Sequence, residues 1–578
     1  MPLRTTLTAL ALALLTAPTP GWAYGLSQFW PPSFTSEGST IVVRFPDPSL
    51  TGEVVYGPAA PGDVPYPVWR FRARLEHGTA RLTVPPKDTF NTSRTERRVQ
   101  TLWLKVVIQG RPVFYLPVQV TREGDAVRVL EGSVVCGPLV YCPRPDGCVI
   151  WYRTLRPVIT EALILDETGR VVCSARDPRP AEIHRIIVRG LRPNAEYRLI
   201  VRWRGYELAQ RRFRTAPPAG AAGFTFAFTA DSRSDERPNV SNGTGDADAY
   251  GCNVWALQRA FAFAAAHGAR FLIFPGDLIW GRGRSEDEIR LQYWNWLQAV
   301  SPWEPLVPVY VGYGNHEAYV GDERLFSELL VTPAELGQGP ADTSEGPNLP
   351  SYGDTVYYFR YGNVAIVTLN NCYTPDVRAH DYGFIRDRQL QWLNRVLDEL
   401  DRDPNVRFVL IAMHVPPLRV AKPGWGVKPD HLEDLNRLLE TLMKHRKVVA
   451  LLCGHDHCYA RYLITRDLPL YPPNWHGRDL RREPWFRPLW VLINGNAGAP
   501  VYGLANNPWN DRLQAFRIAP AHVTLLHVHP DRLTIETYDA LTGELVDRFD
   551  IHAPTPRPSG PKLPVPAIPA IPPRRRRR

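Results

Sequence analysis

From residue 224 onward, short and almost uninterrupted apolar runs alternate with helical patterns, and this alternation constrains the fold more than any other feature. The apolar runs lie at 224–229, 271–274, 306–311, 364–369, 408–413 and 448–453. Runs of this kind are typical of strands that are covered on both faces. Helical patterns lie between them at 255–267, 386–400 and 431–445. Strands that alternate with helices predict a layered α/β domain, which we expect to span residues 221–551.

Polar residues follow these runs in five short motifs. The motifs are Asp231-Ser232-Arg233, Gly276-Asp277, Gly314-Asn315-His316-Glu317, His414 and Gly454-His455-Asp456-His457. Four of the five come directly after an apolar run, where open α/β sheets bind ligands. Each motif alone is a weak signal, because Gly-Asp and Gly-Asn dipeptides are common in turns. The ordered set is informative, because carboxylate, amide and imidazole groups together can hold a pair of metal ions that binds a phosphoryl group.

The order and the flanks of these motifs resemble the calcineurin-like metallophosphoesterase superfamily, and most closely its purple-acid-phosphatase-like branch. The resemblance is strong over residues 221–550. Segments 352–364, 457–461 and 494–500 also resemble stretches common to that branch. The resemblance implies a layered αββα sandwich that holds two metal ions. The donor types suit iron, zinc or manganese and do not choose among them.

The resemblance also implies a role for each ligand candidate. Asp277 would bridge the two metal ions, Asn315, His414 and His455 would complete one metal site, and Asp231 and His457 would hold the other. Asp456 is a candidate for orienting one of the imidazoles, with a plain turn residue as the alternative.

His316 resembles the family's catalytic histidine that does not bind metal. When protonated, it would donate to the phosphoryl oxygen or protonate the leaving group. A structural histidine in the turn is the alternative. Glu317 either tunes His316 or satisfies the same turn.

Two positions depart from the family pattern. Many members have a histidine ligand two residues after the first aspartate, and the purple enzymes have a tyrosine three residues after the bridging aspartate. This chain has Arg233 and Trp280 there, and neither is a usual metal ligand. We therefore expect a protein that is not purple and a first metal that binds more weakly or exchanges more easily. Arg233 could instead bind phosphate as a bidentate guanidinium, or pair with Asp235 at the surface.

Two β-rich modules are predicted before the catalytic domain. Residues 24–123 alternate apolar and polar positions with frequent Gly and Pro, which indicates an all-β accessory module of no recognised family. Residues 124–217 resemble a fibronectin-type-III or immunoglobulin-like sandwich, because segment 191–197 resembles a tyrosine corner and 213–217 a closing strand. Purple acid phosphatases carry such a module, although a generic β sandwich would look much the same.

The two ends of the chain predict its location. Residues 1–23 contain Arg4, an apolar stretch and small residues up to Ala23, as in a cleaved secretory signal peptide. An uncleaved signal anchor is the alternative. Residues 552–578 are Pro-rich and end in five arginines, which predicts a disordered tail. The tail could associate with acidic surfaces or have no partner. We expect a secreted, periplasmic or cell-surface protein with no transmembrane segment after cleavage.

The net charge of +10 comes almost wholly from arginine, since only 7 of the 68 basic residues are lysines. No nucleic-acid-binding motif accompanies the charge, so we interpret it as a compositional bias and expect no specific nucleic-acid partner.

Eight cysteines fit an oxidising compartment. Cys136, Cys142, Cys148 and Cys173 are close enough in sequence for two disulfides, whereas a zinc site would need paired C-x-x-C spacings that are missing. The pairing of all eight is left open by the sequence.

These observations predict an exported, binuclear metal-dependent phosphoesterase. By resemblance, it would hydrolyse small phosphomonoesters or phosphodiesters through attack by a metal-bound hydroxide. The sequence has no Gly-x-x-x-x-Gly-Lys loop, Gly-x-Ser-x-Gly elbow or His-Glu-x-x-His pair that would indicate another catalytic class. One alternative is a secreted or envelope-associated binding protein with a degraded phosphoesterase domain. A narrower one is a nucleotide or cyclic-nucleotide phosphodiesterase.

Overall fold

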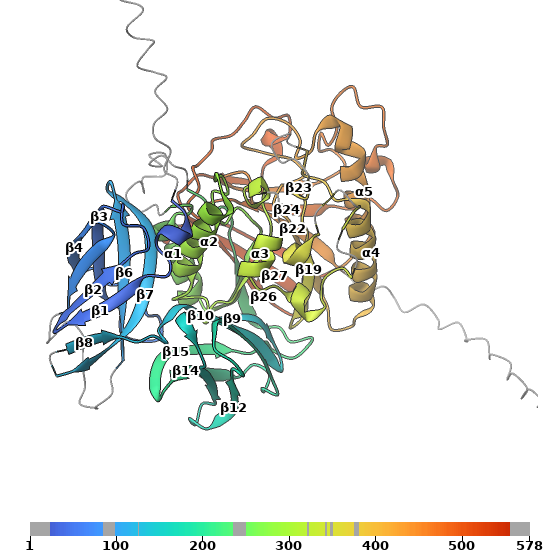
Figure 1. Ribbon diagram of the computed structural model, residues 1–578. Coiled ribbons are helices and arrows are strands. Elements are labelled where there is room, and N and C mark those ends of the chain that lie inside the picture. The colour runs from blue at the N-terminus through green and yellow to red at the C-terminus, as the bar shows by residue number, and fades with distance from the viewer. Residues whose placement is uncertain are drawn as a thin grey trace, which may run out of the picture.

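The computed structural model describes residues 24–84, 99–124, 126–234, 250–320, 323–341, 344–346, 349, 351–374 and 381–554. The predicted signal peptide, almost all of the predicted tail and Asp235 lie outside the described residues. Figure 1 shows two β-rich units packed against one side of a larger α/β unit. Among the helices that the structure describes, none is long and apolar enough to cross a membrane.

The N-terminal unit is one antiparallel sheet of eight strands in the order β1-β2-β5-β4-β3-β6-β7-β8. The strands are β1 Ser33–Glu37, β2 Thr40–Arg44, β3 Gly52–Pro58, β4 Phe71–Glu76, β5 Thr79–Thr83, β6 Gln100–Ile108, β7 Arg111–Glu123 and β8 Ala126–Val129. β8 follows residue 123 and still pairs with β7. The prediction of an all-β N-terminal region is therefore confirmed.

The second unit is a sandwich of a three-stranded and a four-stranded antiparallel sheet. The first sheet contains β9 Val134–Arg144, β10 Gly147–Val158 and β13 Ala181–Arg189, and the second contains β11 Glu161–Leu165, β12 Val171–Arg176, β14 Glu196–Trp203 and β15 Tyr206–Arg214. Ile150 and Leu199 meet in the core between them. The hydroxyl of Tyr197 accepts the backbone N–H of Arg192 at 2.8 Å, as a tyrosine corner would. The fibronectin-type assignment itself stays a prediction.

The C-terminal unit contains two mixed sheets that face each other. The six-stranded sheet has the order β18-β17-β16-β26-β27-β28, and the seven-stranded sheet has the order β19-β20-β21-β22-β24-β23-β25. The first comprises β16 Phe224–Phe228, β17 Ala269–Phe274, β18 Val309–Val311, β26 His522–Val528, β27 Arg532–Asp539 and β28 Leu545–His552. The second comprises β19 Tyr357–Tyr361, β20 Val364–Thr368, β21 Phe408–Ala412, β22 Val448–Cys453, β23 Tyr459–Ile464, β24 Leu489–Asn494 and β25 Ala515–Arg517.

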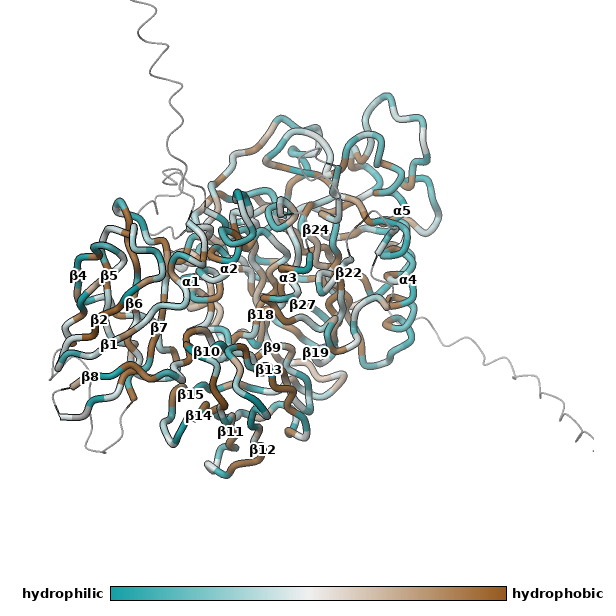
Figure 2. The backbone as a smooth tube through the Cα atoms, in the orientation of Figure 1, coloured by the Kyte–Doolittle hydropathy of each residue, from teal (hydrophilic) through white to brown (hydrophobic). Residues whose placement is uncertain are grey.

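Helices cover the outer faces of both sheets. They are α1 Val254–Ala266, α2 Glu286–Val300, α3 Glu323–Leu329, α4 Asp387–Arg402 and α5 Leu432–Lys444. Phe226 and Leu410 belong to the core between the sheets. Leu272 lies on the opposite, outer face of the six-stranded sheet and packs with α1 and α2. Leu451 lies on the outer face of the seven-stranded sheet and packs with α4 and α5. Figure 2 shows apolar strand segments in the interior, so the predicted αββα layering is confirmed.

Helix α2 joins the C-terminal unit to both β units. The indole N–H of Trp294 donates to the carbonyl of Tyr115 at 2.6 Å, and the Gln298 amide donates to the carbonyl of Val135 at 2.6 Å. The carboxylate of Glu304, just past the helix, accepts the N–H of Val140 at 2.7 Å. The three units therefore share buried polar contacts as well as apolar packing.

All eight cysteines are free in this structure. The two disulfides considered for the cluster of Cys136, Cys142, Cys148 and Cys173 are not formed. Seven of the eight are buried and Cys173 is half-buried, so these thiols pack as small apolar side chains.

Candidate metal centre

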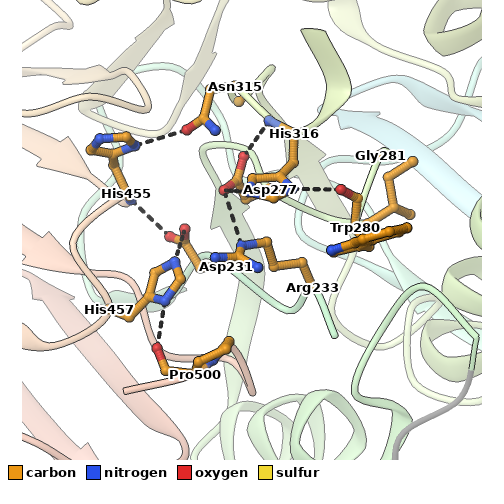
Figure 3. Close-up of polar contacts among 12 residues, drawn as sticks. Asp231, Arg233, Asp277, Trp280, Gly281, Asn315, His316, His455, His457 and Pro500 are labelled. Atoms are coloured by element: carbon orange, nitrogen blue, oxygen red, sulfur yellow. Dashed lines mark hydrogen bonds and ion pairs between the residues drawn. The ribbon is translucent and has the colours of Figure 1, made fainter. Parts of the chain in front are cut away.

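The predicted ligands lie just beyond the C-terminal ends of strands from both sheets. Asp231 follows β16, Asp277 follows β17, Asn315 follows β18, His414 follows β21, and His455 and His457 follow β22. β16, β17 and β18 run parallel to one another, as do β21 and β22. Parallel strands end at the same edge of a sheet, so these loops meet where the two sheets face each other. Figure 3 shows Asp231, Asp277, Asn315, His455 and His457 pointing toward a common centre.

Two glycines of the motifs are there because the carboxylates approach the backbone closely. A Cβ atom at Gly314 would lie 2.3 Å from Asp277 Oδ1, and one at Gly454 would lie 2.4 Å from Asp231 Oδ2. Asp231 and Asp277 themselves have φ values of 61° and 54°, in the left-handed region. Non-glycine residues with such backbones are concentrated at functional sites, where the surrounding structure compensates for their strain.

Asp231 and His457 present two acceptor atoms to each other without a hydrogen between them. His457 donates its Nδ1–H to the carbonyl of Pro500, which leaves a lone pair on Nε2. This Nε2 lies 3.4 Å from Asp231 Oδ1, and both atoms are buried with no hydrogen-bond partner. Ligand atoms of Asp231, Asp277 and His457 all lie within 4.8 Å of one another. Buried acceptors without donors are costly, and a cation between them would satisfy both, so this group fits a metal ion.

Possible ligand atoms also converge on the other side of the centre. His414 donates Nδ1–H to the carbonyl of Pro275 at 3.2 Å, which turns its Nε2 lone pair inward. That Nε2 lies 3.2 Å from both Asn315 Oδ1 and Asp277 Oδ1. The Nδ1 atom of His455 is 2.8 Å from the same Asn315 oxygen. The donor set of two imidazoles, one amide oxygen and one carboxylate also fits a transition-metal ion.

The two buried carboxylates cannot both be ionised cheaply without a cation. Burial, together with the neighbouring Asp277 charge, raises the pKa of Asp231 well above its ordinary value. Burial also disfavours ionised Asp277, but His414, His316 and Arg233 outweigh this and hold its pKa well below its usual range. A cation bound between the two carboxylates would stabilise both of them in the ionised form that binds metal.

The two histidines of the Gly-His-Asp-His motif are held in the neutral form that binds metals. Burial lowers the pKa of His455 well below its ordinary value, and the nearby Lys422 charge adds to this. Burial likewise lowers the pKa of His457, with Arg233 as the next contribution. Metal binding to imidazole does not then have to compete with a proton near neutral pH.

The structure places Arg233 beside the centre and only 7% exposed. Its Nε lies 3.8 Å from Asp277 Oδ2, and its Nη2 donates to the hydroxyl of Tyr502 at 3.2 Å. The guanidinium therefore occupies the side of the centre where the family pattern would place another ligand. The Trp280 position contributes its carbonyl oxygen to the site, and that oxygen accepts Nδ1–H of His316.

His316 lies next to the proposed metal ligands and is not itself needed as a ligand. Its Nε2 is 3.9 Å from Asp277 Oδ2, and its backbone N–H donates to Asp277 Oδ1 at 2.9 Å. Burial lowers the pKa of His316 well below its ordinary value, Arg233 adds to the effect and Asp277 opposes it. The side chain is thus oriented by Trp280 with one nitrogen directed into the site.

Comparison with known proteins identifies this region. Residues 225–459, which contain every predicted ligand, match the model of the calcineurin-like phosphoesterase family. This segment is a calcineurin-like phosphoesterase domain. The family is one of metal-dependent phosphoric-ester hydrolases, in agreement with the buried Asp231, Asp277 and His457 group.

Relatives of the phosphoesterase domain are distant. An uncharacterised protein of Mycobacterium tuberculosis strain H37Rv is 26% identical over 202 residues, which are 33% of this chain and 34% of that protein. The chain thus spans about a third of the length of that relative. A probable glycerophosphodiester phosphodiesterase, GpdQ, of Arcobacter nitrofigilis is 26% identical over 190 residues, 29% of this chain and 63% of that protein.

One solved structure resembles the whole chain and not only the phosphoesterase domain. The purple acid phosphatase PPD1 of yellow lupin is 14% identical, and the match covers 89% of this chain and 93% of that chain with a TM-score of 0.54. At this identity the likeness shows the fold alone. It agrees with the predicted purple-acid-phosphatase-like arrangement of β units before an αββα domain.

The sequence interpretation did not single out Lys422 and Tyr502 as part of the phosphoesterase site. The Lys422 ammonium donates to the carbonyl of His455 at 3.2 Å, and the Tyr502 ring stacks on His457 with centroids 4.2 Å apart. Neither residue follows an apolar run. The one available signal concerned Lys422, which is one of only 7 lysines in the chain.

The two acidic residues left open by the motifs hold backbone rather than imidazoles. Glu317 accepts the N–H groups of Asp277 and Gly314, both at 2.8 Å, and so ties two motifs together. Burial, and then the Asp277 charge, raises the pKa of Glu317 to about 8. Asp456 accepts the N–H of Ala421 at 2.9 Å, and its Oδ2 also accepts that of Val420. Asp456 therefore fixes the loop that carries Lys422.

Proposed function

We propose that this protein is an exported phosphoesterase that uses two metal ions to hydrolyse small phosphomonoesters or phosphodiesters. One observation carries the proposal: side chains that can bind metal converge on both sides of Asp277. Asp231 Oδ1 and His457 Nε2, which have no hydrogen-bond partner, lie 3.4 Å apart, and His414 Nε2 and Asn315 Oδ1 lie 3.2 Å apart on the other side. One carboxylate between two such groups is the arrangement expected of a binuclear site.

Asp277, Asn315, His414 and His455 would hold one metal ion, and Asp231, Asp277 and His457 the other. When bound, a pair of this kind supplies Lewis-acid stabilisation of the phosphoryl oxygens and an activated water. Iron, zinc and manganese all fit the oxygen and imidazole donors.

The protein's own groups orient the substrate and manage one proton. Arg233, which is buried beside Asp277, would bind a phosphoryl oxygen through its guanidinium. His316 keeps a proton on Nδ1 because Trp280 accepts it. A bound phosphoryl anion would offset the Arg233 charge that disfavours protonation of His316, so Nε2 could then donate a proton to the departing oxygen.

The rival hypothesis is a binding protein with a degraded phosphoesterase domain. It predicts that metal-loaded protein releases no phosphate, although the β units and the arginine-rich tail would be functional. The intact set of predicted ligands favours the enzyme. A nucleotide or cyclic-nucleotide phosphodiesterase is contained within the proposal and is separated by substrate profiling.

The deciding experiment combines metal analysis with hydrolysis. Elemental mass spectrometry on the purified mature chain, without added metal, should give two metal ions per chain. An aryl phosphate and a bis-aryl phosphate then serve as general substrates. His316→Ala should lower kcat on the order of a hundredfold or more, as for loss of a general acid, with metal content unchanged. His476→Ala, an exposed histidine, is the matched control. Metal-loaded wild type that cleaves neither substrate would sink the proposal.

Export is tested separately. Expression with the native N-terminus should give a mature chain that begins at Tyr24 in the periplasmic or extracellular fraction. A full-length chain that stays in the cytoplasm would contradict it.

A further inference from the structure

We propose that Lys422 and Arg233, gathered on Tyr502, form a two-cation clamp for the phosphoryl group that selects phosphomonoesters over phosphodiesters. The proposal rests on the proposed function for the reaction and adds the residues that choose within its substrate class. Lys422 and Tyr502 belong to none of the five motifs.

Tyr502 is the element that relates the two cations to the metal ligands. Its ring lies parallel to the imidazole of His457, with centroids 4.2 Å apart and an interplanar angle of 13°. Its hydroxyl accepts Nη2–H of Arg233 at 3.2 Å. The Lys422 ammonium lies 5.4 Å from the centroid of the same ring, within the range of a cation–π contact. One aromatic side chain thus contacts two positive charges beside the centre.

Lys422 is directed at the centre and not at a structural counter-ion. Its Nζ donates to the His455 carbonyl at 3.2 Å and lies 3.4 Å from His455 Nε2. Within the described part of the chain, it forms no ion pair with a carboxylate. A half-buried ammonium that donates only to a neutral carbonyl and an imidazole retains capacity for an anion.

The loop that carries Lys422 is fixed before any ligand arrives. Asp456 accepts the N–H of Ala421 at 2.9 Å, directly before the lysine. The side-chain amide of Asn507 donates to the carbonyls of Arg419 and Lys422, both at 2.9 Å. Preorganised cations lose little entropy when an anion binds, and they therefore contribute more to its stabilisation.

Charge balance then indicates what the clamp binds. Among the described carboxylates, the charges of Asp231 and Asp277 act on both Arg233 and Lys422, and the charge of Asp456 acts on Lys422 as well. When Asp231 and Asp277 bind metal ions, their charge compensates the guanidinium and the ammonium less. The positive charge added beside the centre favours a group with two negative charges over one with a single charge. A phosphomonoester carries up to two charges on three non-bridging oxygens, whereas a diester carries one charge on two.

Binding of two small probes to the metal-loaded protein tests this without catalysis. Isothermal titration calorimetry measures the affinities of inorganic phosphate and dimethyl phosphate for wild type, Lys422→Met, Lys422→Arg and Tyr502→Phe. Lys444→Met, an exposed lysine paired with Glu440, is the matched control. The Lys422→Met variant loses one charge-assisted contact, so it should bind phosphate about tenfold to a hundredfold more weakly than wild type. Its affinity for dimethyl phosphate should fall about threefold or less. Lys422→Arg should restore most of the phosphate affinity.

The kinetic counterpart is the ratio of kcat/KM for an aryl phosphate to that for a bis-aryl phosphate. This ratio should fall about tenfold in Lys422→Met and severalfold in Tyr502→Phe, with two metal ions still bound. Phosphate affinity in Lys422→Met equal to that in Lys444→Met would overturn the clamp, as would equal losses for both probes. If wild type hydrolyses nothing but its phosphate affinity depends on Lys422, the clamp stands and the proposed reaction fails.

Discussion

The two halves of the candidate metal centre are built differently although they share Asp277. The half formed by Asn315, His414 and His455 offers three further donors and follows the family pattern at every position. The half formed by Asp231 and His457 offers two further donors, and its remaining side is occupied by Arg233, 3.8 Å from Asp277. The first half therefore offers its metal ion more protein ligands. The second half offers fewer ligands and has a positively charged side chain beside them.

This difference indicates a division of labour. A site with four protein donors stabilises its ion regardless of substrate, whereas a site with three has room for exchangeable ligands. Arg233 lies at the second half, whereas Lys422 contacts His455 of the first half. The second half therefore has fewer protein ligands and a guanidinium beside them, and we expect it to bind its metal ion more weakly. Four predictions test the comparison, in order of expected effect.

Asp277→Asn should have the largest effect, because it removes the charge common to both halves. We expect kcat/KM to fall on the order of a thousandfold or more, since the metal pair contributes several kcal/mol to the transition state. Bound metal should decrease at both sites in elemental analysis. Retention of two tightly bound ions would show that Asp277 is not the bridging ligand.

His414→Ala and His457→Ala should separate the halves. His414→Ala leaves three donors on its side, so its ion should remain with affinity lowered at least about tenfold, since even changes to the partners of a ligand cost that much. His457→Ala leaves only two, and its ion should be lost on gel filtration. Metal content per chain after gel filtration checks both variants. Equal metal loss in the two would contradict the proposed asymmetry.

Arg233→His should remove the asymmetry by placing an imidazole where the guanidinium lies. We expect affinity for the second metal ion to rise about tenfold, because a repulsive cation is exchanged for a donor. Inorganic phosphate affinity should fall by a similar factor. Competition with a chelator measures the first quantity and calorimetry the second. Arg233→Gln, which removes the charge without adding a metal donor of the same kind, is the control.

Asp456→Asn should have the smallest effect, because it acts only through the loop that carries Lys422. The amide keeps one acceptor for the N–H groups of Val420 and Ala421 but loses the charge. We expect phosphate affinity to fall about threefold to tenfold, since neutral hydrogen bonds are roughly half as strong. Metal content should not change. A loss as large as that of Lys422→Met would mean that Asp456 has a more direct role.

The family and the loops that carry the candidate ligands could be predicted from the sequence, because the motifs that indicate them are short and continuous. Each motif follows a buried strand. The glycines before Asn315 and His455 leave room for carboxylates, because a Cβ atom there would lie 2.3 Å from Asp277 Oδ1 or 2.4 Å from Asp231 Oδ2. The helices expected at 255–267, 386–400 and 431–445 correspond to α1, α4 and α5. Each of these helices buries one face, so apolar residues recur in its sequence at helical spacing.

Helix α2 shows where such reasoning stops. It contains Trp294, Asn295 and Gln298, all buried, because β units lie on its outer side. A helix that is covered almost all round by its own and other units does not carry a simple amphipathic stripe. The predicted domain boundaries are likewise statements about composition, and they stay predictions.

The sequence by itself determined the α/β layering, the family and the ordered set of candidate ligands, since strand periodicity and metal-binding residue types are encoded within a few neighbouring positions. Only the tertiary structure decided how the centre is completed. It placed Arg233 beside Asp277, Tyr502 against His457 and Lys422 on the carbonyl of His455. These residues lie far apart in the chain and meet because loops from two sheets end at the same edge. Long-range electrostatic partners of that kind have no local pattern, so folding alone reveals them.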